Sequence, residues 1–93
     1  MTVATLRLEL RVDSSHSSWE KRRRMRAIMD KLHRYFNISV ADADHATDPA
    51  QAILIVAAVG RTRREVRETL AQVADAVAVY PRAELLSHEI VEV

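Results

Sequence analysis

Two helices can be located in this chain of 93 residues, because two capping boxes are each followed by apolar residues at helical spacing. The boxes are Ser-Ser-Trp-Glu at 17–20 and Thr-Arg-Arg-Glu at 62–65. They predict helices near 18–36 and 62–80, and Pro81 stops the second. The two apolar stripes are Met25, Ile28, Met29, Leu32 and Phe36, then Val66, Leu70, Val73, Val77 and Tyr80.

Four other segments have the patterns of strands. Over residues 6–12, apolar side chains alternate with charged ones, which is typical of a half-buried strand. The run 52–59 is apolar on both faces, as in a central strand, and Gly60 ends it. Further strands are expected at 38–43 and 85–91. The predicted order is therefore strand, helix, strand, strand, helix, strand.

This order favours one architecture. The simplest closed solution is an α+β sandwich, with an antiparallel four-stranded sheet in the order 4-1-3-2 and both helices on one face. This is the ferredoxin-like βαββαβ arrangement. No linker interrupts the pattern, so we expect a single domain over residues 1–93.

Composition excludes several classes of protein. With 48% hydrophobic and 29% charged residues the chain is globular, and its net charge of +1 gives no overall attraction for polyanions. The absence of cysteine excludes disulfides, thiolate catalysis and cysteine-ligated zinc. The longest apolar run is too short to span a bilayer, and the first charges come too early for a signal peptide. We therefore expect a cytoplasmic protein without a membrane partner.

Positive charge gathers at the start of the first predicted helix. A helix N-terminus carries a partial positive charge, so cations there need acidic neighbours or an anionic partner. The topology places this cluster near a hairpin that carries Asp42, Asp44 and Asp48, and a solvated, neutralised face is the alternative to an anion or RNA contact. The cluster comprises Lys21, Arg22, Arg23, Arg24 and Arg26.

A second basic cluster is predicted at the opposite end of the sheet. It comprises Arg61, Arg63 and Arg64 from the start of the second helix, with Arg34 from the end of the first. Because fewer acids are expected nearby, this end is predicted to be the better anion site.

No catalytic constellation is present, so we expect neither enzymatic activity nor a cofactor. His16 and His45 could meet the hairpin aspartates, but no tight ligand spacing supports a metal site. RNA binding by stacking on the sheet is excluded, because the two central strands contain no aromatic residue. Trp19 is predicted to pack against the helix start rather than to stack on a base.

Several motifs resemble those of the YlxP-like family, small bacterial proteins of undetermined function. Ser-Ser-Trp-Glu-Lys-Arg at 17–22 and Tyr-Phe-Asn-Ile-Ser-Val-Ala-Asp at 35–42 are similar to family motifs, and Asp-His at 44–45 and Ala-Glu-Leu-Leu at 83–86 fit in register. The chain departs from the family at 49–52, where a Trp-Gln-Arg-Ala lead is replaced by Pro-Ala-Gln-Ala. The resemblance implies a ferredoxin-like fold and, through the family's gene neighbours, a role linked to ribosomes or translation.

Three functions remain open. The first is a non-enzymatic accessory protein that contacts ribosomal RNA or a ribosomal subunit, and not DNA, through its basic helix ends. The second is an interaction module that forms a homodimer, because one strand carries large apolar side chains on both faces while helices cover only one. The third is a small-molecule-sensing domain of the ACT type, whose glycine-bearing ligand loop is missing. The expected interface residues are Ile53, Leu54, Ile55 and Val56.

Overall fold

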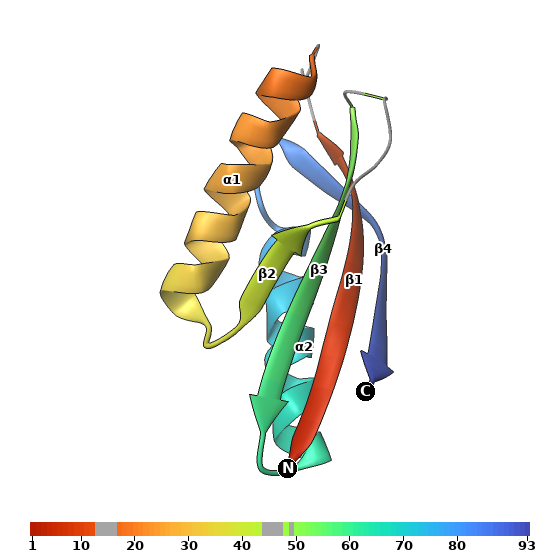
Figure 1. The fold of residues 1–93 in the computed structure, drawn as a ribbon. Coiled ribbons are helices and arrows are strands. Elements are labelled where there is room, and N and C mark those ends of the chain that lie inside the picture. Colours follow the sequence, from red (N-terminus) through yellow and green to blue (C-terminus); the bar gives the residue numbers. More distant parts are fainter. Residues whose placement is uncertain (13–16, 44–47, 49) are drawn as a thin grey trace.

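The computed structural model describes residues 1–12, 17–43, 48 and 50–93, and the chain is an α+β protein (Figure 1). Four strands and two helices follow one another in the predicted order, strand, helix, strand, strand, helix, strand. The elements are β1 (Thr2–Val12), α1 (Ser18–Tyr35), β2 (Ser39–Asp42), β3 (Gln51–Gly60), α2 (Arg63–Ala78) and β4 (Ala83–Glu92). Within the described residues, neither helix is long and apolar enough to cross a membrane.

The strands form one open antiparallel sheet in the order β2-β3-β1-β4, which is β4-β1-β3-β2 when read from the other edge. Strand β1 begins at Thr2, four residues before the predicted start, because its first residues pair with the end of β3, where Thr2 lies opposite Gly60. At its other end Arg11 lies opposite Gln51. The short β2 pairs with only part of β3, from Ser39 opposite Ala57 onward.

One face of the sheet carries the core. Alternate residues of β1 and β3 are buried, and they form a single cluster with the apolar stripes of both helices. Figure 1 shows α2 behind the two central strands and α1 beside β2. The cluster includes Leu6, Leu8, Leu10, Leu54 and Val56 from the sheet, Met25, Ile28 and Leu32 from α1, and Val66, Leu70, Val73 and Val77 from α2.

Both helices begin where the capping boxes predicted. The backbone N–H of Glu20 donates to Ser17 Oγ at 3.1 Å, and that of Glu65 donates to Thr62 Oγ1 at 3.1 Å. Helix α2 ends at Ala78, two residues before the predicted end. The turn to β4 then contains Arg82, the one non-glycine residue with positive φ in the described chain, at 69°.

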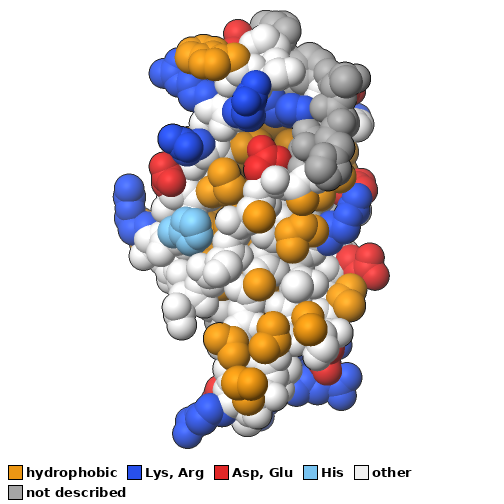
Figure 2. Space-filling model, viewed as in Figure 1, with side chains coloured by type: hydrophobic (Ala, Val, Ile, Leu, Met, Phe, Trp, Pro, Cys, Tyr) orange, Lys and Arg blue, Asp and Glu red, His pale blue; other side chains and the backbone are white. Residues whose placement is uncertain are grey.

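The expected interface residues divide between the two faces of β3. Leu54 and Val56 are fully buried in the core, so the prediction that they form an interface is wrong. Ile53 and Ile55 lie on the opposite, open face, where they are partly buried. The reason is the two-residue period of a strand, which sends neighbouring side chains to opposite faces. Figure 2 shows hydrophobic side chains running along β3 and β1 in this view, with charged groups beside them.

Candidate nucleic-acid interface

The start of α1 and the turn that follows α2 enclose a cleft of about 700 Å³. Helix α1 supplies one wall and residues 80–82 supply the other. The cleft is lined by Val12, Trp19, Glu20, Arg23, Arg24, Ala27, Ile28, Tyr80, Pro81 and Arg82. Segments about sixty positions apart in the sequence therefore build one site, at the end of the sheet where β4 begins.

Three arginines line this cleft, and none of them forms an ion pair with a described carboxylate. Arg23 and Arg24 come from the predicted basic cluster, whereas Arg82 comes from the turn before β4. The five ion pairs within the described residues all involve other arginines. Glu20 is the acidic residue among the lining side chains. The cleft is therefore suited to an anion.

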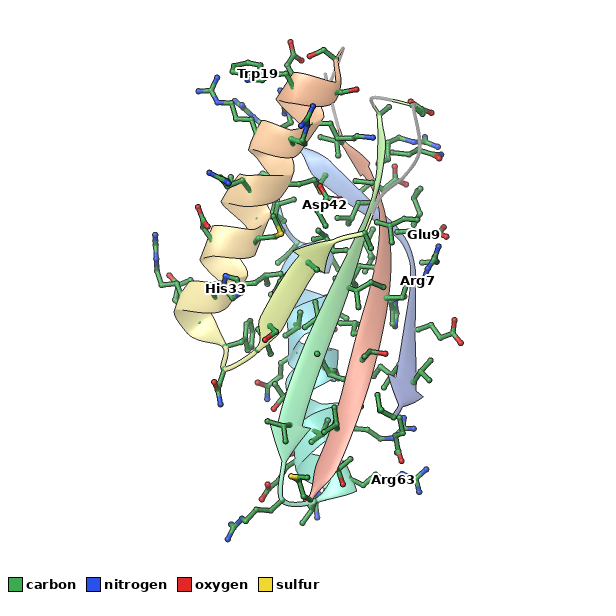
Figure 3. All side chains as sticks on the ribbon, viewed as in Figure 1. Arg7, Glu9, Trp19, His33, Asp42 and Arg63 are labelled. Carbon is green, nitrogen blue, oxygen red and sulfur yellow. The ribbon has the colours of Figure 1, made fainter. Side chains whose placement is uncertain are left out.

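Trp19 lines the cleft, and the prediction that it packs against the helix start is wrong. Its side chain is 65% exposed, and the guanidinium carbon of Arg23 lies 5.5 Å from the centre of its ring (Figure 3). The helical period explains the exposure: Trp19 lies nine residues before the buried Ile28, two and a half turns away, and so projects from the opposite side of α1.

Lys21 does not belong to the anion site, although it was predicted there. It is only 5% exposed, and its ammonium group donates to the backbone carbonyl of Asp48 at 3.0 Å. Its aliphatic stem covers the core while the charged end reaches the segment before β3. Arg22 and Arg26 are exposed and lie outside the cleft lining.

The second basic cluster is neutralised, which corrects the expectation that it meets fewer acids. Arg64 pairs with Glu68 at 3.0 Å, and Arg61 lies 3.8 Å from Glu65. Arg63 pairs with Glu92, the last residue of β4, and Arg67 reaches the same carboxylate at 3.0 Å. The hydrogen bond from Arg63, supported by that from Arg67, holds the pKa of Glu92 below its ordinary value.

Arg34 does not join this second cluster. It lies in the last turn of α1, which ends beside the start of β2. Figure 1 shows the start of α2 at the far end of the sheet, next to the N-terminus, and Figure 3 labels Arg63 there. The expectation failed because β2 is short and α1 stops part of the way along the sheet.

Sequence reasoning missed Tyr80, Pro81 and Arg82 as members of the site. Tyr80 was assigned to the core stripe of the second helix and Pro81 to the helix stop. The signal in the sequence is an aromatic residue and a cation on either side of a proline, directly after a helix. This signal is weak as long as it is not known that the start of α1 lies opposite these residues.

Part of the metal hypothesis lies outside the described residues, namely His16, Asp44 and His45. Within the residues that the structure describes, no group of three or more histidine, aspartate or glutamate side chains could hold a metal ion. Asp48 uses one carboxylate oxygen to accept from the backbone N–H of Ala50 at 2.8 Å.

Comparison with known families places the chain in one of them. The model of the family described as "Protein of unknown function (DUF503)" matches residues 3–90, which is nearly the whole sequence. The chain belongs to this family. No curated protein matches it. Membership in DUF503 assigns no activity, so a function for this member has to be argued from the site itself.

Proposed function

We propose that the protein is a non-enzymatic accessory protein that binds RNA through the cleft between the start of α1 and residues 80–82. The observation that carries the proposal is the set of three arginines in that cleft, Arg23, Arg24 and Arg82, none of which pairs with a described carboxylate. RNA offers the phosphates that arginine binds in forked geometry. The basic residues at the start of α2 are occupied by glutamates and take no part.

Ribosomal RNA is the RNA we propose, in cytoplasmic ribosome maturation or translation. The support is the resemblance of residues 17–22 and 35–42 to motifs of the YlxP-like family. We assign the chain to that group within the uncharacterised family, and its fold to the ferredoxin-like class. The support for the fold class is the βαββαβ element order and one core shared by both helices and the sheet.

The test compares two double variants in binding to purified ribosomal RNA across a range of salt concentrations. Arg23→Ala with Arg24→Ala should weaken binding, and each lost phosphate contact should flatten the slope of log affinity against log salt by roughly 0.7 to 0.9. Arg63→Ala with Arg64→Ala is the matched control, because these arginines also begin a helix but pair with Glu92 and Glu68. The control should bind like the wild type.

Two outcomes would contradict this proposal. The wild-type protein could show no salt-dependent RNA binding at low ionic strength, or the control pair could lose as much affinity as Arg23 and Arg24. Folding should not confuse the result, because Arg23 is exposed, Arg24 is half-buried, and arginines near a positive helix terminus contribute little stability.

A homodimer formed through the open face of the sheet is the second candidate. Ile53 and Ile55 lie on that face, where Val59 of the same strand and Val91 of β4 are 55% and 49% exposed. An apolar strip of this kind invites a second copy of the chain. The dimer is compatible with RNA binding, because the cleft lies between α1 and the turn that follows α2 and contains no residue of the open face of β3. A ligand-sensing role of the ACT type ranks behind both.

A further inference from the structure

A groove continues from the cleft along the space between the two helices. A second, smaller hollow of about 30 Å³ lies next to the cleft and shares two lining residues with it, Ile28 and Tyr80. Its walls come from the second half of α1 and the end of α2. The second hollow is lined by Ile28, Lys31, Leu32, Tyr35, Phe36, Ala76, Val77 and Tyr80.

Every aromatic residue of the chain lines this groove. The sequence contains one tryptophan, two tyrosines and one phenylalanine. Trp19 lines the cleft, Tyr35 and Phe36 line the smaller hollow, and Tyr80 lies in both. Trp19 and Tyr35 are 65% and 68% exposed, which is unusual for the largest apolar side chains of a small protein. Phe36 and Tyr80 also pack against the core, so core packing leaves the exposure of Trp19 and Tyr35 without an explanation.

Cations are interleaved with these rings. Arg23 lies over Trp19, and the ammonium of Lys31 lies 5.2 Å from the centre of the Tyr80 ring. Along α1, residues at intervals of four form one ridge, which turns by about 160° around the helix axis from its first member to its last. Its members are Trp19, Arg23, Ala27, Lys31 and Tyr35. At 1.5 Å per residue, this ridge extends over about 24 Å.

We infer that this groove binds single-stranded RNA by stacking unpaired bases on the aromatic rings while the cations contact the phosphates. The inference rests on the proposed function and specifies which form of RNA is bound. Aromatic platforms inside a positively charged groove are the physical basis of single-strand binding, because every base has a stacking face. A duplex keeps its bases stacked inside the helix and offers mainly phosphates and 2′-hydroxyls. A purely acidic protein segment, without apolar side chains, would use the cations but leave the rings without a role.

Trp19 is the only tryptophan of the chain, so the tryptophan fluorescence of the protein reports on the surroundings of this one side chain. The wild-type protein is titrated with a short single-stranded RNA, with a hairpin duplex of the same composition, with inorganic polyphosphate and with polyglutamate. We expect the single strand to quench the tryptophan fluorescence and to bind most tightly. Polyphosphate should bind weakly without the same quenching.

Variants separate stacking from charge, with affinity measured by the anisotropy of a labelled RNA. Trp19→Ala should lower the affinity for the single strand by about 5- to 150-fold, the loss expected for one stacked base, and Trp19→Phe should recover part of it. Val79→Ala is the control, because Val79 is 82% exposed, neighbours Tyr80 and lines neither hollow. Circular dichroism checks that each variant folds, and the exposure of Trp19 favours this.

The two proposals fail in different ways. If duplex and single strand bind equally and Trp19→Ala has no effect, stacking in the groove is wrong while phosphate binding by the arginines stands. If polyglutamate binds more tightly than RNA and displaces it, the occupant is an acidic protein segment and the inference is overturned. If none of the RNAs binds, the proposed function itself fails.

Discussion

Lys21 is the cation of α1 that has a structural role. Its neighbours Arg22 and Arg23 are exposed, whereas Lys21 is 5% exposed and donates to the carbonyl of Asp48. A buried charge is retained only where its hydrogen-bonding groups find partners, and here the partner is the backbone before β3. The basic run at 21–26 therefore mixes one structural residue with binding candidates.

Replacement of Lys21 should lower the free energy of unfolding. Lys21→Ala removes the buried stem and the donor to Asp48, and should cost about 1–3 kcal/mol. Lys21→Met keeps most of the stem, so it should cost less. Urea denaturation measures both, with Arg22→Ala as a control that should change stability by no more than about 0.5 kcal/mol. Equal stability of all three variants would mean that the contact with Asp48 contributes nothing.

Arg82 joins the cleft from a turn in which its backbone is strained. A φ of 69° is a conformation that costs an ordinary residue roughly 1–2 kcal/mol and that glycine or asparagine adopts more easily. The side chain nevertheless lines the cleft beside Tyr80 and Pro81.

At the scale of elements, Glu92 links the end of β4 to the start of α2 through hydrogen bonds. Its carboxylate accepts from Arg63 and from Arg67, two residues one helical turn apart. The sequence separations are 29 and 25 residues, so this contact joins the last strand to a helix across the fold. It also explains why the start of α2 tolerates several arginines.

The pair should make stability depend on pH. The hydrogen bond from Arg63 lowers the pKa of Glu92 in the folded state below its ordinary value of 4.5. A lowered folded pKa stabilises the protein above the unfolded pKa, and this contribution is lost as the pH falls through the folded pKa. The difference in stability between wild type and Glu92→Gln should therefore be constant near neutral pH and shrink below about pH 4.5.

Urea denaturation at a series of pH values measures that difference. Glu89→Gln is the matched control, because Glu89 lies on the same strand and forms no ion pair with a described residue. A difference for Glu92→Gln that stays unchanged from neutral to acidic pH would show that its carboxylate is not held by the two arginines.

At the scale of the whole molecule, the two sides of the sheet differ in what they expose. The helices, with the groove between them, lie on the side of the core, whereas the open side carries an apolar strip with one ion pair among the described residues. Arg7 and Glu9 form that pair at 2.6 Å, opposite Ile55 and Ile53 on β3 (Figure 3). The hydrogen bond from Arg7, with its charge, holds the pKa of Glu9 below its ordinary value.

We predict that two copies associate through this open side. In a twofold arrangement Arg7 of one copy can face Glu9 of the other while the isoleucines are buried. Light scattering after size exclusion should give a mass near twice 10.6 kDa, and Ile55→Glu should halve it. Val79→Glu is the control, since Val79 is 82% exposed and lies outside the sheet. A wild-type mass near 10.6 kDa across a wide concentration range contradicts the dimer.

The sequence alone was sufficient for the positions and types of the six elements. Local patterns explain this: Ser17 and Thr62 cap the helices through residues three positions later, and alternation over 6–12 reflects the two faces of a single strand. The first four residues of β1 were missed, because residues 2–5 pair with β3 without a clear pattern of their own.

Within the candidate site, the sequence located Arg23 and Arg24 but not their surroundings. Trp19 was misplaced, although its spacing of nine residues from Ile28 already puts it on the opposite side of the helix. Tyr80 and Arg82 are recognised as site residues only in the folded chain, where the end of α2 lies opposite the start of α1.

What the sequence determined is local, because capping, helical period and strand alternation depend on neighbours within a few positions. Only the tertiary structure decided which cations acquire distant partners. Arg63 pairs with the carboxylate of Glu92 across 29 residues, and Lys21 donates to the backbone carbonyl of Asp48 across 27, while Arg23 and Arg24 pair with no described carboxylate. The physical reason is that charged residues in similar stretches of sequence acquire different partners when the helices pack on the sheet. How the helices pack is fixed by the burial of the shared core.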